Sequence, residues 1–344
     1  MNNNESLFNV SKQPLRIEVV RSTSKFISSM SDVSAKDIVS LLSKHYSDVI
    51  MTNVNTIADL EALVARKPDL VFSGLYFIRD EARNGAKVWL ADILEQHGIP
   101  YTGSDKHANR LSLNKHLAKQ RLVEQGINTP AFKLARRDDT APVTEGSLQF
   151  PLFVKPSNKS GGQGIDVFSV VHTTEQLQDK VRSIHENDHT DALIEEYLSG
   201  REFSVAIIGD LDGGLMPMPL ELVAAEDSNG DRIRSQIIKS TDSEDMNEVT
   251  DPIERALVGN FAVDAFRAIG GAGYGRIDLR FNSACVPFFL EANHIPSLLQ
   301  IDSSFLRAYE FTYGKDYEAM LLQLVQLALD RNYATTRQEF SPNL

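Results

Sequence analysis

Strand-like and helix-like segments alternate in the N-terminal part of the chain. Residues 15–20, Leu-Arg-Ile-Glu-Val-Val, place apolar and polar side chains alternately, as a half-buried strand does. The pattern continues with strands at 48–54 and 69–75 and with helices at 34–46, 57–65 and 83–97. This alternation is typical of a parallel sheet with helices on its faces. We therefore expect a doubly wound α/β domain over residues 1–104, which ends at Tyr101-Thr102-Gly103-Ser104.

Beyond this domain the sequence favours many strands with few helices between them. A strongly helical segment covers residues 106–125, and Gly126 is a suitable stop signal. Further strands are expected at 152–155, 165–171, 192–198, 202–208, 216–223, 233–239, 275–281 and 286–292, and further helices at 174–185, 252–269 and 316–330. The last two strands are spaced as a hairpin. Grouping of this kind indicates an α+β arrangement, which we divide into residues 105–190 and 191–344.

Composition excludes several classes of protein. The formal net charge is -12, so the chain lacks the basic surface with which nucleic-acid binders neutralise phosphates. The single cysteine, Cys285, excludes an internal disulfide and a zinc site made of cysteines. Residues 1–5 have neither the basic start nor the apolar run of a signal peptide, and no apolar stretch is long enough to span a bilayer. We expect a cytoplasmic protein that binds neither nucleic acid nor membranes.

Three oxygen-bearing side chains lie on the two strands of the expected hairpin. Asp278 lies within the apolar segment Arg276-Ile277-Asp278-Leu279, and Glu291 and Asn293 end the next strand. Side chains two residues apart on a strand share one face, so pairing of the two strands would bring the three together. Two carboxylates and an amide oxygen suit a hard cation such as Mg²⁺. The alternative, that Glu291 and Asn293 end a strand facing solvent, stays open at this point.

A glycine-rich stretch follows the strand at 152–155. It reads Ser157-Asn158-Lys159-Ser160-Gly161-Gly162-Gln163-Gly164, and closely spaced glycines allow backbone N–H groups to approach phosphate oxygens. Taken alone the signal is weak, because most glycine-rich turns bind nothing. The spacing matches neither the P-loop pattern nor the dinucleotide-binding pattern.

Lysines and acids at element ends complete the set of candidates. Three lysines, Lys115, Lys155 and Lys239, would suffice to neutralise a triphosphate, although a lysine at an element end is more often simply solvated. The strand at 192–198 ends in paired acids and is followed by Gly200-Arg201-Glu202. Such a strand can offer backbone edges to a base and carboxylates to sugar hydroxyls.

Six stretches, taken in order, resemble the ATP-grasp family and specifically the D-alanine–D-alanine ligases. They are Tyr101–Ser104, Leu111–Lys115, Val154–Ser157, Ile194–Phe203, Gly275–Asp278 and Leu290–Asn293. One such match would be weak, but six in the same order are specific. The resemblance runs from about Tyr101 to Asp330. It implies an ATP-grasp fold that follows an N-terminal pre-ATP-grasp domain, with the phosphate-covering loop in residues 105–190 and the metal site in residues 191–344.

The resemblance also implies a role for each candidate residue. Around the nucleotide it implies Lys115 and Lys155 at the phosphates, the loop of Ser160, Gly161, Gly162 and Gly164 over the γ-phosphate, Glu195, Glu196, Tyr197 and Leu198 around the adenine, and Glu202 at the ribose. Around the reacting groups it implies Lys239 at the transferred phosphoryl, Arg276 at the acyl phosphate, Ser297 at the oxyanion, and Asp278, Glu291 and Asn293 on two Mg²⁺ ions, for which Mn²⁺ is an expected substitute.

The implied reaction forms a C–N bond at the expense of ATP. Phosphorylation turns a carboxylate, which is a poor electrophile, into an acyl phosphate with a good leaving group. An amine then attacks, and the tetrahedral oxyanion collapses with loss of phosphate. The metals and Arg276 would spread the charge of both steps, and closure of the loop would exclude water.

The chain departs from the ligase pattern on the side of the carboxylate donor. After the first strand, D-alanine ligases carry a glutamate that orients the first D-alanine, whereas Arg21-Ser22-Thr23-Ser24-Lys25-Phe26 holds no acid. Leu75 to Asp80 replaces a turn that usually contains histidine, and its Tyr76 and Arg79 suggest a larger or anionic donor. Ser297 follows Pro296 where the family has glycine. The acceptor-binding serine falls near Asp302, beside Ser303 and Ser304.

These departures favour the same reaction on a different first substrate, a small-molecule carboxylate or carbonyl donor joined to an amino-acid acceptor. Specialised relatives include ligases that attach an amino acid to mycosporine-glycine, where ATP would activate a vinylogous carbonyl. Alternatives are an L-amino-acid dipeptide ligase, a true D-alanine–D-alanine ligase, and a carboxylase-like enzyme of another ATP-grasp branch. A non-catalytic nucleotide-binding regulatory module is the alternative from another class. Whether the chain is a homodimer, as the family often is, stays open.

Overall fold

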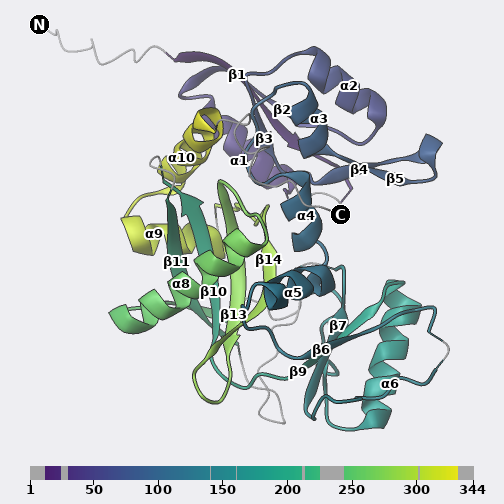
Figure 1. Ribbon diagram of the computed structural model, residues 1–344. Coiled ribbons are helices and arrows are strands. Elements are labelled where there is room, and N and C mark those ends of the chain that lie inside the picture. Colours follow the sequence, from purple (N-terminus) through teal and green to yellow (C-terminus); the bar gives the residue numbers. More distant parts are fainter. Residues whose placement is uncertain are drawn as a thin grey trace, which may run out of the picture. The chain divides into compact units, whose positions relative to one another are not determined.

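Two compact units make up the chain (Figure 1). The first contains Met1–Thr102, Ser297–Ile301 and Asp316–Leu344, and the second contains Gly103–Pro296 and Asp302–Lys315. The structure, a computed structural model, describes residues 12–24, 30–139, 141–159, 161–210, 214–224, 244–300 and 303–331. Of the helices in these ranges, none is long and apolar enough to cross a membrane. The domain boundaries expected at residues 104 and 190 stay predictions.

The first unit is built on a parallel sheet, as its alternating sequence predicts. Its strands are β1 (Gln13–Arg21), β2 (Tyr46–Asn53) and β3 (Leu70–Ser73), in the order β2-β1-β3. The helices of this unit are α1 (Asp32–Leu42), α2 (Ile57–Ala65), α3 (Leu90–Gln96) and α10 (Tyr317–Asp330). Apolar side chains such as Val20, Val71 and Leu94 form the core between sheet and helices. Strands β1 and β3 are neighbours although β2 lies between them in sequence, so β2 and β3 lie on opposite sides of β1 while all three strands stay parallel.

The helix expected at 83–97 is wrong in its first half. Residues 77–89 form a hairpin of β4 (Phe77–Asp80) and β5 (Ala86–Trp89), with a 3-10 turn, η1 (Glu81–Arg83), at its tip. Asn84 and Gly85 adopt φ values of 54° and 72°, which reverse the chain. The rings of Phe77 and Trp89 then meet across the hairpin at 5.4 Å. Only α3 keeps the helical conformation that the apolar spacing predicts.

The second unit begins with a small antiparallel sheet covered by one helix (Figure 1, teal). Its strands are β6 (Phe132–Ala135), β7 (Leu152–Pro156), β8 (Val170–Val171) and β9 (Ala192–Glu196), in the order β6-β9-β7-β8. Leu177 and Val181 of α6 (Thr174–Ser183) belong to the same core as Leu152 and Ile194, and α6 runs into a π-helical turn, η2 (Ile184–Asp188). The strand expected at 165–171 is reduced to β8, because Asp166 and Ser169 bond each other in a turn.

A larger antiparallel sheet follows in the same unit. Its strands are β10 (Glu202–Gly209), β11 (Leu215–Ala224), β12 (Glu244–Glu248), β13 (Tyr274–Phe281) and β14 (Pro287–Asn293), in the order β12-β11-β10-β13-β14. Helix α8 (Pro252–Ala268) packs on this sheet through Phe266, which shares a core with Phe203 and Phe289, and α9 (Ser304–Tyr313) contacts β10 and β11. The expected hairpin of the last two strands is confirmed. The strand expected at 233–239 lies outside the described residues.

The helix expected at 106–125 is two helices, α4 (Lys106–Ser112) and α5 (Lys115–Glu124). Asn114 has extended backbone angles and its side chain accepts a hydrogen bond from the backbone N–H of Leu117 at 3.1 Å, which starts a new helix. The expectation of one continuous helix is therefore wrong at Asn114, the N-cap of α5. The break places Lys115 in the first turn of α5 and Lys119 one turn further on.

We expect Asn114→Ala to lower the free energy of unfolding by about 1 kcal/mol, because the N–H group of Leu117 loses its acceptor. Asn114→Asp keeps an acceptor at the same place and serves as the matched control. Urea denaturation of the three proteins measures the effect. Equal stability of the alanine variant and the wild type would show that the cap contributes nothing.

Candidate active site

The register of the β13–β14 hairpin brings the predicted metal ligands together. Asp278 lies opposite Glu291 and Arg276 lies opposite Asn293. Residues opposite each other in an antiparallel pair, and residues two apart on one strand, point to the same face. The hairpin therefore gathers two carboxylates, one amide and one guanidinium at one end. Their roles as metal ligands and as catalytic arginine stay predictions.

Asp278 is a buried carboxylate with strong polar partners. Only 3% of the residue is exposed. The Arg276 guanidinium donates to both of its oxygens at 2.9 Å, and the hydroxyl of Ser204 on β10 donates to Oδ1 at 2.7 Å. Two parallel N–H···O bonds of this kind fix both the charge and the orientation of the carboxylate. Arg276 also donates to the hydroxyl of Ser304 at 3.5 Å.

Glu291 is held by the lysine at the start of α5. The Nζ atom of Lys115 lies 3.4 Å from Glu291 Oε2 and also donates to the backbone carbonyl of Lys159. Burial lowers the pKa of the Lys115 ammonium, although the charge of Glu291 opposes this shift. Asn293 Oδ1 accepts a hydrogen bond from the N–H of Ile295 at 3.2 Å.

The residues of the hairpin fit a magnesium site. Two carboxylates that face each other across a hairpin repel unless positive charge lies beside them, and Arg276 and Lys115 supply such charge here. Carboxylate and amide oxygens are ligands that Mg²⁺ accepts. No cluster of three or more acidic, histidine or cysteine side chains suited to a metal occurs among the described residues, so a third protein donor would be the Asn293 amide.

A pocket in the second unit collects most of the residues that the sequence predicts for the nucleotide. The lining residues predicted for the nucleotide are Lys155, Gly162, Glu195, Glu196, Tyr197, Leu198 and Glu202, and those predicted for the metal are Asp278 and Glu291. The sequence did not single out the others, Pro130, Phe153, Ile165, Arg280 and Leu290. These include apolar side chains from both sheets of the unit. One wall can therefore cover a flat apolar group, while charged side chains of either sign stand nearby.

Glu195 carries the most buried charge of the pocket wall. The residue is 2% exposed, and its two oxygens lie 2.8 Å from Lys119 Nζ and 2.9 Å from Lys155 Nζ. Burial alone would raise the pKa of Glu195, but the two lysines outweigh it and lower that pKa. The side chain thus points to the lysines. An adenine ring beside this strand would meet the backbone of residues 195–198 instead.

Arg280 lines the pocket and contacts several of its neighbours. Its Nε donates to the carbonyl of Gly200 at 2.9 Å, and its guanidinium lies 5.1 Å from the centre of the Tyr197 ring. Nη1 lies 3.8 Å from a carboxylate oxygen of Glu202, the residue expected at the ribose. Arg280 therefore contacts both Tyr197 and Glu202, the two residues that the sequence assigns to the adenine and to the ribose.

The glycine-rich stretch has the backbone that only glycine adopts readily. Gly161, Gly162 and Gly164 have φ values of 68°, 81° and 75°. A Cβ atom on Gly164 would lie 2.4 Å from Cγ of Pro156, so this glycine also lets the chain pass close to β7. Gly162 lines the pocket. Ser160 lies outside the described residues.

Of the remaining candidates, those that the structure describes are not among the residues that line this pocket. Lys239 lies outside the described residues. In the first unit, Tyr76 is buried before β4, and Arg79 is exposed on β4 and donates to the carbonyl of Gly85 at 3.1 Å. Ser297 also belongs to the first unit. In the second unit, Ser303 caps α9, and Ser304, next to it, is the partner of Arg276 named above.

Sequence reasoning missed Lys119, Ser204 and Arg280. Lys119 is four residues after Lys115, and this helical spacing was a usable signal because it places both lysines on one face of α5. Ser204 and Arg280 depend on the pairing of β10 with β13, in which Ser204 lies opposite Asp278 and Glu202 opposite Arg280. A strand register cannot be derived from the separate strands.

The buried Lys119 predicts a pH dependence of stability. Burial lowers its pKa from 10.5 to about 8, so between these pH values the unfolded chain binds more protons than the folded one. The free energy of unfolding should therefore rise with pH across this window, by at most about 3 kcal/mol from this group. Urea denaturation of wild type and Lys119→Met at pH 8 and pH 10 isolates the contribution. A stability difference between the two proteins that stays constant with pH would contradict it.

Comparison with known proteins finds a matching family model and several relatives of similar length. A family model described as D-ala D-ala ligase C-terminus matches residues 122–326. An uncharacterised protein of Sinorhizobium fredii is 29% identical over 279 residues, which cover 78% of this chain and 77% of that protein. A D-alanine–D-alanine ligase of Bordetella petrii is 27% identical over 278 residues, which cover 81% of each chain.

A solved structure shares the fold. The D-alanine–D-alanine ligase from Bacillus anthracis complexed with ATP superposes with a TM-score of 0.72 at 21% identity, covering 95% of this chain and 100% of that one. Likeness at this level of identity shows the fold alone. The expected architecture, an ATP-grasp fold after an N-terminal doubly wound domain, is confirmed.

Proposed function

The chain belongs to the D-alanine–D-alanine ligase C-terminus family and is an ATP-dependent, ADP-forming carboxylate–amine ligase, and we propose that it uses Mg²⁺ and takes a donor other than D-alanine. One observation carries the nucleotide and metal part of the proposal. Lys155, Asp278 and Glu291 line a single pocket together with the apolar wall of Phe153 and Leu290. A nucleotide needs such a combination, because its base is flat and apolar while its phosphates need cations.

Residues of the pocket and of its surroundings have distinct tasks in this proposal. Lys155 and Lys115 bind phosphate oxygens of ATP while an oxygen of the donor attacks the γ-phosphorus and ADP leaves. Arg276, beside Asp278, then faces the oxyanion that forms when the acceptor amine attacks the activated carbon, and phosphate departs as that oxyanion collapses. The glycine-rich stretch around Gly162 covers the phosphates and keeps water out.

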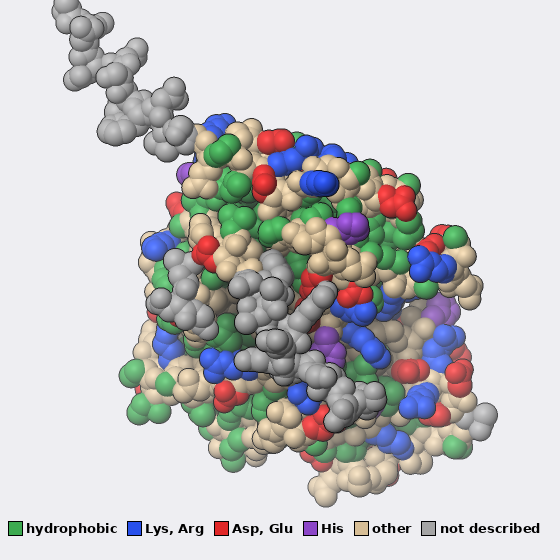
Figure 2. Space-filling model, turned by 45° about the horizontal axis from the view of Figure 1, so that its top comes forward, with side chains coloured by type: hydrophobic (Ala, Val, Ile, Leu, Met, Phe, Trp, Pro, Cys, Tyr) green, Lys and Arg blue, Asp and Glu red, His purple; other side chains and the backbone are tan. Residues whose placement is uncertain are grey.

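Asp278, Glu291 and Asn293 are the residues proposed to hold Mg²⁺. When bound, the metal neutralises the phosphate charge that develops during transfer. Asp278 is already oriented by Arg276 and Ser204, so the protein presents this ligand in a fixed position. Figure 2 shows Lys and Arg side chains interspersed with Asp and Glu side chains on one face of the molecule.

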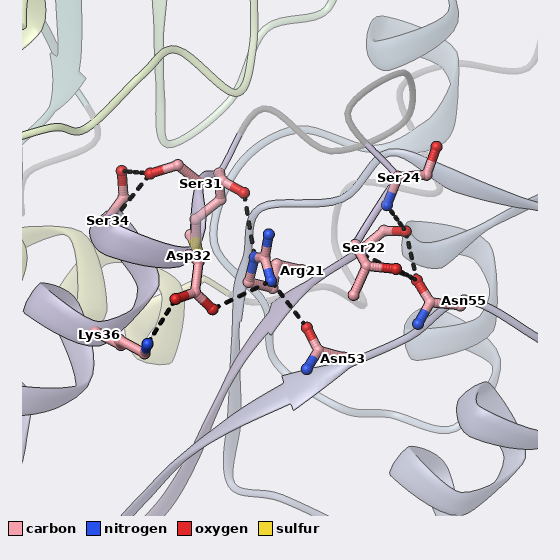
Figure 3. Close-up of polar contacts among 11 residues, drawn as sticks. Arg21, Ser22, Ser24, Ser31, Asp32, Ser34, Lys36, Asn53 and Asn55 are labelled. Atoms are coloured by element: carbon pink, nitrogen blue, oxygen red, sulfur yellow. Dashed lines mark hydrogen bonds and ion pairs between the residues drawn. The ribbon is translucent and has the colours of Figure 1, made fainter.

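The segment after β1 argues for a donor other than D-alanine. The sequence from Arg21 to Ser31 contains no aspartate or glutamate, whereas D-alanine ligases use a glutamate there to orient the donor. Figure 3 shows how the described part of this segment is bonded: Asn55 Oδ1 accepts from Ser22 Oγ at 2.8 Å and from Thr23 N at 3.0 Å. The described side chains that directly follow Arg21 in this segment carry hydroxyl groups, and the carboxylate drawn nearby, Asp32, is paired with Arg21 and Lys36.

Arg21, at the start of the same segment, has an acidic partner and two hydrogen-bond acceptors close by. Its guanidinium donates to Asn53 Oδ1 at 3.1 Å and to the carbonyl of Met30 at 3.3 Å, and it lies 3.5 Å from Asp32 (Figure 3). The described part of the segment is rich in hydroxyl groups, and Asp32, which follows the segment, offsets the charge of Arg21. We propose a donor that binds through hydroxyl and carbonyl groups, of which a mycosporine-glycine-like molecule with a vinylogous carbonyl is the specific candidate.

Release of ADP and phosphate against a panel of donor and acceptor pairs tests this function. The panel contains D-alanine, L-amino acids, and mycosporine-glycine with serine. We expect release that requires both a donor and an acceptor, with D-alanine alone among the weakest. Best turnover with D-alanine alone would refute the altered donor site. Tight ATP binding with no turnover by any pair would favour the non-catalytic nucleotide-binding module.

A further inference from the structure

Lys119 is a buried lysine that the roles proposed above do not use. Its side chain is 0% exposed, and it is not one of the residues that line the pocket. Nζ donates to Thr129 Oγ1 at 2.7 Å and to the carbonyl of Phe289 at 3.1 Å, and lies 2.8 Å from Glu195 Oε1. Its partners thus come from β9, from β14 and from the segment before β6.

Glu195 links this lysine to the pocket. One carboxylate oxygen contacts Lys119 and the other lies 2.9 Å from Lys155, which does line the pocket. Counting two lysines and one glutamate, the three side chains together carry a charge of 2 − 1 = +1. Because all three are buried, water screens their interactions weakly, and a change of charge at Lys119 is felt at Lys155.

A side chain that only filled this space would not need the charge of Lys119. A buried ammonium costs free energy unless strong partners offset it, and an apolar side chain of similar length could fill the same space. The cost is visible in the pKa of Lys119, which burial lowers to about 8 against the opposing effect of Glu195. A charge kept in such a place therefore calls for a role that depends on charge.

We propose that Lys119 is a positioning residue for nucleotide binding. It neutralises part of the negative charge of the Glu195 carboxylate, so that Lys155, which contacts the other oxygen, keeps net positive charge toward the phosphates. Without Lys119, the negative charge of Glu195 would be neutralised by Lys155 alone, and the summed charge at these three positions would fall to zero. The inference rests on the proposed function, because it takes Lys155 as a ligand of the nucleotide phosphates.

A charge-restoring double variant separates this role from a structural one. Lys119→Met removes one positive charge, and adding Glu195→Gln returns the set to +1, the charge of Lys155 alone. We expect the single variant to bind ADP about tenfold more weakly than wild type, and the double variant to recover most of that loss. Thr129→Val, which removes a hydrogen bond of Lys119 but no charge, is the matched control and should stay within about twofold of wild type.

The measurement is isothermal titration of the four full-length proteins with ADP and Mg²⁺, and with adenosine as a probe that has no phosphates. Weakened ADP binding with unchanged adenosine binding in the single variant supports the proposal. Equal ADP binding by Lys119→Met and wild type, or a double variant that binds worse than the single one, overturns it and leaves the ligase function standing. A wild-type protein that does not bind ADP would overturn both.

Discussion

Glu291→Gln and Asp278→Asn should each lower the rate of ligation by about a thousandfold, because metal-assisted charge stabilisation is worth several kcal/mol in the transition state. Both substitutions preserve the shape of the side chain, remove its negative charge and replace one accepting oxygen by an NH2 group. In Glu291→Gln the ammonium of Lys115, 3.4 Å away, also loses its counter-charge. In Asp278→Asn the two hydrogen bonds from Arg276 can no longer both be kept.

The measurement is kcat for ADP release with the donor and acceptor pair that the panel identifies as active. Glu248→Gln provides a matched control, since Glu248 lies on the edge strand β12 with an exposed carboxylate and an ion pair of 3.8 Å to Arg255. We expect this control to retain full activity. If the Asp278 and Glu291 variants have the same kcat as the control, these two residues do not hold a catalytic metal.

Arg276→Lys should lower kcat by about a hundredfold or more, the usual cost of losing a donor aimed at developing negative charge. Lysine keeps the positive charge but not the two-pronged contact with Asp278 or the reach to Ser304. The effect should lie in kcat and leave the affinity for ATP nearly unchanged, since the guanidinium is proposed to act after the nucleotide is bound.

Steady-state kinetics with ATP as the varied substrate separates the two parameters. Arg267→Lys, at an exposed position of α8, is the control for an arginine-to-lysine change in the same unit. A large rise in KM for ATP with an unchanged kcat would place Arg276 at the nucleotide instead of at the acyl group.

The site could be foreseen where it depends on strand alternation. Asp278, Glu291 and Asn293 lie on strands whose apolar residues mark them clearly, and a hairpin pairing of two neighbouring strands is a short-range property. The β4–β5 hairpin replaces the first half of the expected helix because Asn84 and Gly85 take positive φ values that reverse the chain and let β5 pair with β4. The break at Asn114 was also missed.

Other parts of the site depend on contacts between distant residues. Lys119 and Glu195 are far apart in the sequence, and only the packing of α5 against β9 and β14 makes them partners. Ser204 meets Asp278 because β10 pairs with β13 in one register among several that apolar alternation permits. Periodicity describes each element well, but it does not determine which elements become neighbours.

The most direct test of the central claim is to follow oxygen-18 from a labelled donor during turnover with ATP and Mg²⁺. If the donor oxygen attacks the γ-phosphorus and leaves with phosphate after the amine adds, the label must appear in inorganic phosphate as product and ADP accumulate. Mass spectrometry of the phosphate reads this out. Labelled phosphate formed in step with the C–N product is the result we predict. Unlabelled phosphate, or AMP and pyrophosphate in place of ADP and phosphate, would contradict the account.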